Sequence, residues 1–138
     1  MDTEQQIRLN FLDEAEEYFN LMESNLLGLA DTAIEPQQVD LVLRAAHSIK
    51  GGAAMMSFNT LSQVAHRLED FFKILRVRYA GETVSVEVET LLLQSLDYLR
   101  HLASSNRQEL STVDLLVKNQ QPEILSDRIQ AIFEQLRS

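Results

Sequence analysis

The stretch AAHSIKGGAAMM, residues 45–56, combines a helical pattern with two consecutive glycines beside a histidine and a lysine. A glycine in a helix interior costs about 1 kcal/mol relative to alanine. Two glycines in a row therefore weaken a helix unless something requires bare backbone there. The stretch indicates that the surface next to His47 has to stay uncovered.

Helical spacing extends over most of the chain on both sides of this stretch. With only 2 prolines and 4 glycines among 138 residues, long helices are expected. Apolar residues recur every three or four positions, as in amphipathic helices, over residues 7–29, 39–53, 61–75, 88–102 and 125–136. No alternating stretch is long enough to predict a sheet. We predict an all-α fold, an antiparallel four-helix bundle with an additional C-terminal helix, which makes five helices in a single domain over 1–138.

Several boundaries and faces follow from individual residues. Pro36 suits the first turn of the second helix, and Asn59 is the expected N-cap of the third. The polar segment 104–121 is ambiguous and is expected to add at most a short helical turn over 113–117. The expected buried stripe of the first helix comprises Ile7, Phe11, Ala15, Tyr18, Met22, Leu26 and Leu29.

Composition and charge narrow the class of protein. Apolar residues make up 45% of the chain, enough for a real core, and there is no cysteine for a disulfide or a thiolate zinc site. The net charge of -9 argues against binding to nucleic acid or to an anionic membrane. Residues 44–78 hold six basic and two acidic side chains, a local +4. A soluble cytoplasmic protein is expected, with a locally basic segment around His47.

Four polar residues are predicted to converge on one site. The second and third helices are joined by a tight turn and should pack antiparallel, with His47 about ten residues before the turn and Glu69 about ten after it. At a rise of about 1.5 Å per residue, the two side chains fall at similar heights. Lys50 lies one turn from His47, and His66 lies one turn from Glu69.

The glycines next to this cluster leave the imidazole open to a bulky partner. Gly51 is one turn beyond His47, and Ala54 is a further small residue on the same side. A general base would need a substrate pocket and a nucleophile or oxyanion device, and the sequence shows neither a strained elbow nor a phosphate-binding loop. A zinc site built from His47, His66 and Glu69 has no matching motif, and the Lys50 ammonium would repel the cation. A histidine that is merely structural, hydrogen-bonded to a glutamate, is the plain alternative.

The remaining interpretation makes His47 a nucleophile. A carboxylate that accepts the N–H of one ring nitrogen fixes the tautomer and enriches the other nitrogen in electrons. Glu69 is placed for that role, and the Lys50 ammonium would neutralise the oxygens of a phosphoryl group. Histidine, orienting glutamate, ammonium and open approach together are typical of a phosphoryl-accepting site.

At these residues the sequence resembles a known family. LRAAHSIKGGAAMMSF (43–58) followed by LSQVAHRLEDFF (61–72) closely resembles the histidine-containing phosphotransfer (HPt) domain at the N-terminus of CheA-type histidine kinases. The HxxKG core is His47, Lys50 and Gly51, and the downstream HxxE is His66 and Glu69. Residues 11–29 are more weakly similar. AAMMSF departs from the family because it lacks a glycine that often precedes the phenylalanine, which affects the identity of the partner more than the chemistry.

The resemblance implies a role for each site residue. His47 would be phosphorylated at Nε2, Glu69 would accept the Nδ1 proton, and Lys50 and His66 would complete the polar network. The docking surface would comprise Gly51, Gly52, Arg44 and Ala54. The implied partners are the ATP-binding domain of a histidine kinase, in cis or in trans, and the receiver domain of a response regulator.

The same resemblance implies that the chain depends on other domains for its activity. It implies a relay without its own ATP site, metal or cofactor, and therefore not an enzyme alone. It also implies an N-terminal part of a larger CheA-like kinase. The alternative is a helical interaction module with a degenerate site that is never phosphorylated.

Overall fold

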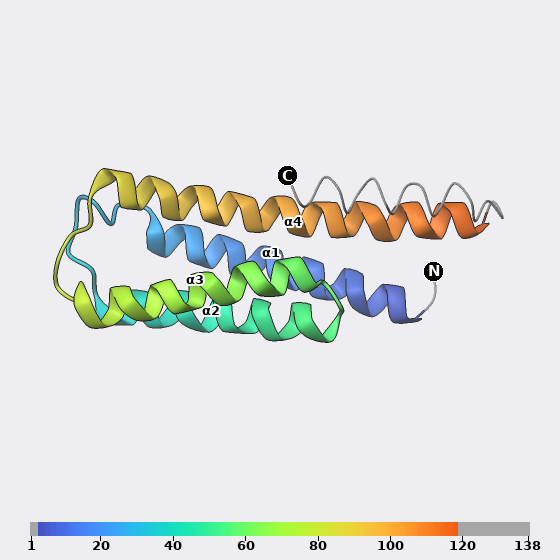
Figure 1. The fold of residues 1–138 in the computed structure, drawn as a ribbon, viewed down its shortest axis with the longest axis horizontal. Helices are drawn as coiled ribbons and strands as arrows, with labels where there is room; N and C mark the ends of the chain where they lie inside the picture. Colours follow the sequence, from blue (N-terminus) through green and yellow to red (C-terminus); the bar gives the residue numbers. More distant parts are fainter. Residues whose placement is uncertain (1–2, 119–138) are drawn as a thin grey trace.

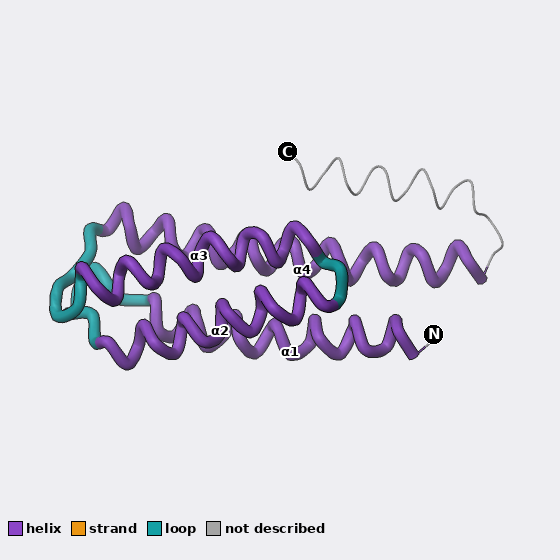
Figure 2. Tube along the Cα trace, turned by 60° about the horizontal axis from the view of Figure 1, so that its bottom comes forward, coloured by secondary structure: helices purple, strands orange, loops and turns teal. Residues whose placement is uncertain are grey.

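The computed structural model describes residues 3–118, which form four helices and no strand. They are α1 (Thr3–Leu26), α2 (Pro36–Met55), α3 (Asn59–Arg78) and α4 (Val86–Lys118). Each helix runs antiparallel to the next along the chain, and α1 and α4 extend beyond the turn that joins α2 to α3 (Figures 1 and 2). The helical bundle is confirmed for this part of the chain, whereas the predicted fifth helix lies outside the described residues.

The two helices that matter most for function form a tight hairpin. Pro36 is the first residue of α2, as predicted. At the turn, Ser57 has φ 64°, and the Phe58 N–H donates to the Ala53 carbonyl at 2.8 Å. The Phe58 ring is buried and stacks on Phe11 of α1, with ring centroids 6.2 Å apart. A buried aromatic ring, tied to α1, therefore fixes where the hairpin turns.

The prediction that Asn59 caps α3 is wrong. Asn59 is the first residue of the helix, and Phe58 occupies the N-cap position without any side-chain hydrogen bond to the helix. A cap side chain normally satisfies one of the first free N–H groups. Here burial of the Phe58 ring decides the start of the helix instead.

The core side of α1 differs from the predicted stripe at Ile7 and Tyr18, and Leu29 is buried but lies beyond the helix, which ends at Leu26. Ile7 is exposed, and Tyr18 is only partly buried and donates its hydroxyl to Glu14 at 3.1 Å. The phenol keeps its polar end at the surface in this way. Leu12 and Phe19, which have no polar group, take the core positions and are fully buried.

Helix α4 is longer than the sequence pattern indicated. It runs without interruption through 104–118, where only a short turn was expected. No glycine or proline interrupts residues 82–121, and the small polar side chains of Ser105 and Asn106 are buried. Arg107 donates to Asp13 of α1 at 2.7 Å, which adds a polar link between the two long helices. None of the described helices is both long and apolar enough to cross a membrane.

Candidate functional site

The hairpin of α2 and α3 brings His47 onto a carboxylate. His47 Nδ1 lies 2.9 Å from Glu69 Oε2, and Lys50 Nζ lies 3.0 Å from Glu69 Oε1. The His47 side chain is 69% exposed, whereas that of Glu69 is 4% exposed. The ring is therefore anchored through one nitrogen to a buried acid while most of it faces solvent.

The Glu69 carboxylate stays ionised in spite of its burial. Burial acts to raise the pKa of Glu69, but hydrogen bonds from Lys50, His47 and Lys73 outweigh it and lower the pKa to about 2. An ionised carboxylate can only accept hydrogen bonds, so the contact at 2.9 Å requires the proton on His47 Nδ1. The neutral ring then carries its free electron pair on Nε2.

His66 takes no direct part in this cluster. Its side chain is 59% exposed, and its Nε2 lies 3.8 Å from Oδ2 of Asp70 on the same helix. His66 lies three positions before Glu69, so its side chain leaves the helix in a direction about 60° away from that of Glu69. Glu69 points into the seam between α2 and α3, whereas His66 points to solvent. Of the four residues predicted to converge, the structure brings His47, Lys50 and Glu69 into contact.

Two residues of the site were not anticipated from the sequence. Lys73 Nζ lies 3.3 Å from Glu69 Oε1, and Ser62 Oγ donates to the Lys50 carbonyl at 2.9 Å. The spacing of Glu69 and Lys73, with the acid four residues before the base, is a favourable helical pair and would have signalled the contact. The Ser62 bond has no such signal, because it depends on how α3 faces α2.

The two adjacent glycines have different surroundings. Apart from the backbone of its own helix and its chain neighbours, a Cβ atom on Gly51 would meet nothing within 4 Å, so this position opens onto solvent. A Cβ atom on Gly52 would lie 2.3 Å from Cε1 of Phe11, whose ring packs against the bare backbone of α2. Gly52 therefore has a packing reason that the sequence did not reveal.

The other predicted docking residues lie on the exposed side of α2. Arg44 and Ala54 are exposed, as is Gly51 between them, and His47 lies one turn after Arg44. A small-residue surface thus continues from the imidazole toward the end of the helix. Whether a partner binds there remains a prediction.

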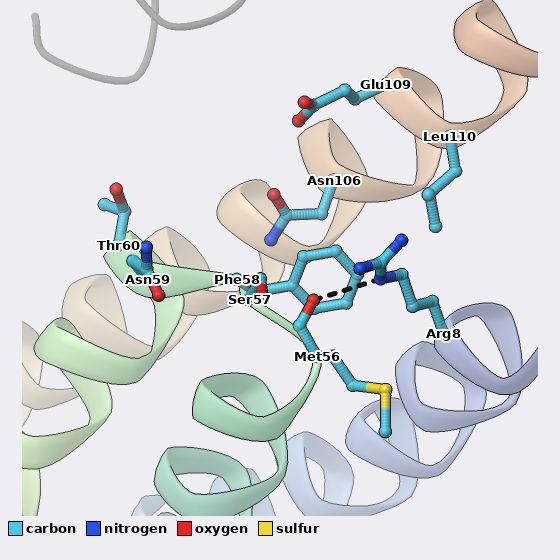
Figure 3. A pocket seen from close by; sticks show the side chains of 9 residues that line it. All are labelled: Arg8, Met56, Ser57, Phe58, Asn59, Thr60, Asn106, Glu109 and Leu110. Carbon is cyan, nitrogen blue, oxygen red and sulfur yellow. Dashed lines mark hydrogen bonds between the residues drawn. The ribbon is translucent and has the colours of Figure 1, made fainter. Parts of the chain in front are cut away.

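The pocket at the α2–α3 turn is separate from His47. It has a volume of about 250 Å³ and lies between the turn and α4 (Figure 3). Its lining comprises Arg8, Met56, Ser57, Phe58, Asn59, Thr60, Asn106, Glu109 and Leu110. Arg8 Nε donates to the Met56 carbonyl at 3.1 Å across this region (Figure 3). His47 itself lies on an open helical surface, which suits a macromolecular partner better than a small substrate.

The cluster does not have the form of a metal site. Among the described residues, no group of three or more His, Asp or Glu side chains could hold a metal ion. The zinc alternative needed His66 as a third ligand, and His66 pairs with Asp70 instead.

Comparisons with known proteins agree with the resemblance. The family described as "Hpt domain" matches residues 6–102. The chain is 36% identical over 96 residues to "Chemotaxis protein CheA" of Treponema pallidum, which covers 70% of this chain and 12% of that protein. It is 37% identical over 90 residues to the CheA of Klebsiella aerogenes, covering 65% of this chain and 14% of the relative. Over 135 residues it is 27% identical to "Sensor histidine kinase CheAY" of Helicobacter pylori, covering 98% of this chain and 16% of that protein.

These matches settle the family and leave the wider protein open. The chain spans only a small part of the length of the relatives that it matches. The family match, in contrast, extends over well more than half of the chain and includes both His47 and Glu69. The chain therefore belongs to the Hpt domain family, the histidine-phosphotransfer modules of two-component signalling.

Proposed function

We propose that His47 is the phosphoacceptor of this domain, and that it passes the group on to an aspartate of a response regulator. The observation that carries the proposal is the exposed ring whose Nδ1 rests on a buried, ionised carboxylate, 2.9 Å away. This arrangement leaves Nε2 with the electron pair and with access to solvent. A ring held in one tautomer by a carboxylate is better prepared for attack than a free imidazole.

The transfer to His47 needs little chemistry beyond position and charge. Nε2 attacks the γ-phosphorus of ATP, the Nε2–P bond forms, and the bond from phosphorus to the bridging oxygen breaks with its electron pair leaving on ADP. Nδ1 keeps its proton, and Glu69 stabilises the positive ring that results. The Lys50 ammonium, whose side chain is 25% exposed and whose Nζ lies 3.0 Å from Glu69 Oε1, adds positive charge beside the site.

The second transfer reverses these roles. The receiver aspartate attacks the phosphorus in line, the P–Nε2 bond breaks, and the electron pair returns to the ring. The His47–Glu69 pair is then back in its starting state. The domain thus acts as substrate and relay, with ATP bound by a separate kinase domain in cis or in trans.

The proposed partners are those of a CheA-type pathway. The relatives are named as chemotaxis proteins, which favours a chemotaxis output and a place in a larger kinase. A receiver domain carries an acidic, magnesium-binding pocket, and exposed basic residues such as Arg44 would help to steer it toward α2. The proposed docking surface follows α2 through Arg44, His47, Gly51 and Ala54.

The chain offers matched controls for the decisive experiment. We expect H47Q to abolish labelling by a CheA-type kinase domain with ATP, and also by phosphoramidate, a small donor that requires no docking. H66Q and H101Q each replace an exposed histidine and should retain the label. Circular dichroism checks that all three variants keep their helices.

Each other outcome has a definite consequence. Full label on H47Q would overturn the assignment of the phosphoacceptor. A folded parent protein that takes no label from either donor would instead support the interaction module with a degenerate site.

A further inference from the structure

One oxygen of the Glu69 carboxylate has two ammonium neighbours. Lys50 Nζ reaches Oε1 at 3.0 Å from α2, and Lys73 Nζ reaches the same oxygen at 3.3 Å from α3. The other oxygen, Oε2, is the one that faces His47 Nδ1. The carboxylate is thus held between two cations on one side and an imidazole on the other.

The two lysines differ in setting. The Lys50 side chain is 25% exposed and belongs to the motif of the family, whereas the Lys73 side chain is 60% exposed and lies one turn after Glu69. If Lys50 were its only ammonium partner, the Glu69 carboxylate would be attracted from α2 alone and could rotate toward that helix. Lys73 attracts the same oxygen from α3, the helix that carries Glu69. Two cations on Oε1, one from each helix, would hold the plane of the carboxylate and keep Oε2 directed at the ring.

The other charged side chains near the site do not pair with Glu69 within the described residues. Arg76 pairs with Asp40 across the same two helices, and Asp70 pairs with His66. Arg44 is exposed on α2, one turn before His47, and no described ion pair joins it to Glu69. Within residues 3–118, the hydrogen bonds and ion pairs to the Glu69 carboxylate come from His47, Lys50 and Lys73.

We propose that Lys73 is a positioning residue for phosphotransfer at His47: it holds Glu69 Oε1 so that Oε2 keeps the proton of His47 on Nδ1. The inference rests on the proposed function of His47, but its central claim concerns the tautomer and can be measured without any transfer. Lys73 does not contact the reacting nitrogen. It acts through Glu69, and we expect a variant without its charge to keep the fold, because the side chain is mostly exposed.

The test compares K73Q with K73R and with R78Q. Arg78 is an exposed cation of the same helix with no described contact to the site, so R78Q removes the same charge as a matched control. Nitrogen-15 NMR of the histidine rings reports which nitrogen of His47 carries the proton. We expect the Nδ1–H form to lose population in K73Q and to be retained in K73R and R78Q.

The rate of labelling by phosphoramidate gives the second readout. We expect a two- to fivefold loss in K73Q, the size typical of a partly exposed ion pair, with recovery in K73R. An unchanged tautomer in K73Q, or a rate equal to that of R78Q, would overturn the role of Lys73. If the parent itself takes no label, the proposed function fails, while the tautomer measurement still decides whether Lys73 positions Glu69.

Discussion

His47 and Glu69 are 22 residues apart in the chain, yet Nδ1 and Oε2 lie 2.9 Å from each other across the seam of α2 and α3. The acid is buried and the imidazole is exposed. This asymmetry separates the two tasks of the site, because the carboxylate is protected from water and the ring remains accessible to partners. A low dielectric around the acid also strengthens its hydrogen bonds.

Substitution of Glu69 should slow phosphorylation of His47 without abolishing it. E69A removes the acceptor of the Nδ1 proton, and we expect a loss of about 10- to 100-fold, by analogy with carboxylates that orient metal-binding histidines. E69Q retains an acceptor oxygen without the charge and should fall between E69A and the parent. Initial rates of labelling by a kinase domain and by phosphoramidate measure the effect.

The neighbouring residue supplies the control for this substitution. Asp70 is exposed and pairs with His66, so D70A should label at the parental rate. A rate for E69A as high as that for D70A would reduce Glu69 to a structural residue.

The same carboxylate makes stability depend on pH. The pKa of Glu69 is about 2 in the folded protein, against an ordinary value of 4.5 for a glutamate in the unfolded chain. A lowered pKa in the folded state contributes stability above pH 4.5 that is lost as the pH falls toward 2. Relative to E69Q, the free energy of unfolding of the parent should fall by about 2 kcal/mol between pH 5 and pH 3.

Urea denaturation of both proteins at each pH measures this difference. The comparison cancels contributions from other acids, such as Asp40 and Glu109, because both proteins contain them. If the free energy of unfolding of the parent and of E69Q changed with pH in parallel, the three partners would not lower the pKa of Glu69 in the folded protein.

The helices and the central pair of the site could be predicted because they depend on local information. Apolar spacing sets the helices, and equal distances of His47 and Glu69 from one tight turn set their meeting. The direction of the His66 side chain was not predictable in the same way. A residue three positions from Glu69 lies about one turn away, but its side chain points about 60° to one side of Glu69. Lys73 could have been found from its spacing to Glu69.

Other features depend on contacts between distant segments. The clash that Phe11 would make with a side chain at position 52 involves residues of two helices, and no pattern in either helix encodes it. The continuity of α4 was hidden because Ser105 and Asn106 are polar by composition but buried by packing. The burial of Phe58 likewise overrode the local preference of Asn59 for the cap.

The length of α4 can be tested with a proline at an exposed position. Gln108 lies in the segment that the sequence left ambiguous, and the structure places it in the interior of α4. Q108P should lower the free energy of unfolding by about 3 kcal/mol, and Q108G by about 1 kcal/mol. Q108A is the control, and an irregular segment would instead tolerate all three variants equally in urea denaturation.

The two glycines should respond to alanine with opposite signs. G51A places a methyl group in open space on a helix and should stabilise the fold by about 0.5–1 kcal/mol. G52A drives its methyl group into the Phe11 ring, which cannot retreat freely because it stacks on Phe58. Such overpacking should cost about 1–3 kcal/mol in urea denaturation.

A second substitution shows whether the Phe11 ring is the cause. Replacing Phe11 by leucine in the G52A protein frees space at the contact, so the combined loss should be smaller than the sum of the two single losses. If the losses simply add, the ring is not what requires a glycine at position 52.

G51A should stabilise the fold but impair docking of a protein partner, because its methyl group narrows the approach to His47. We therefore expect G51A to label normally with phosphoramidate and to transfer more slowly to a receiver domain.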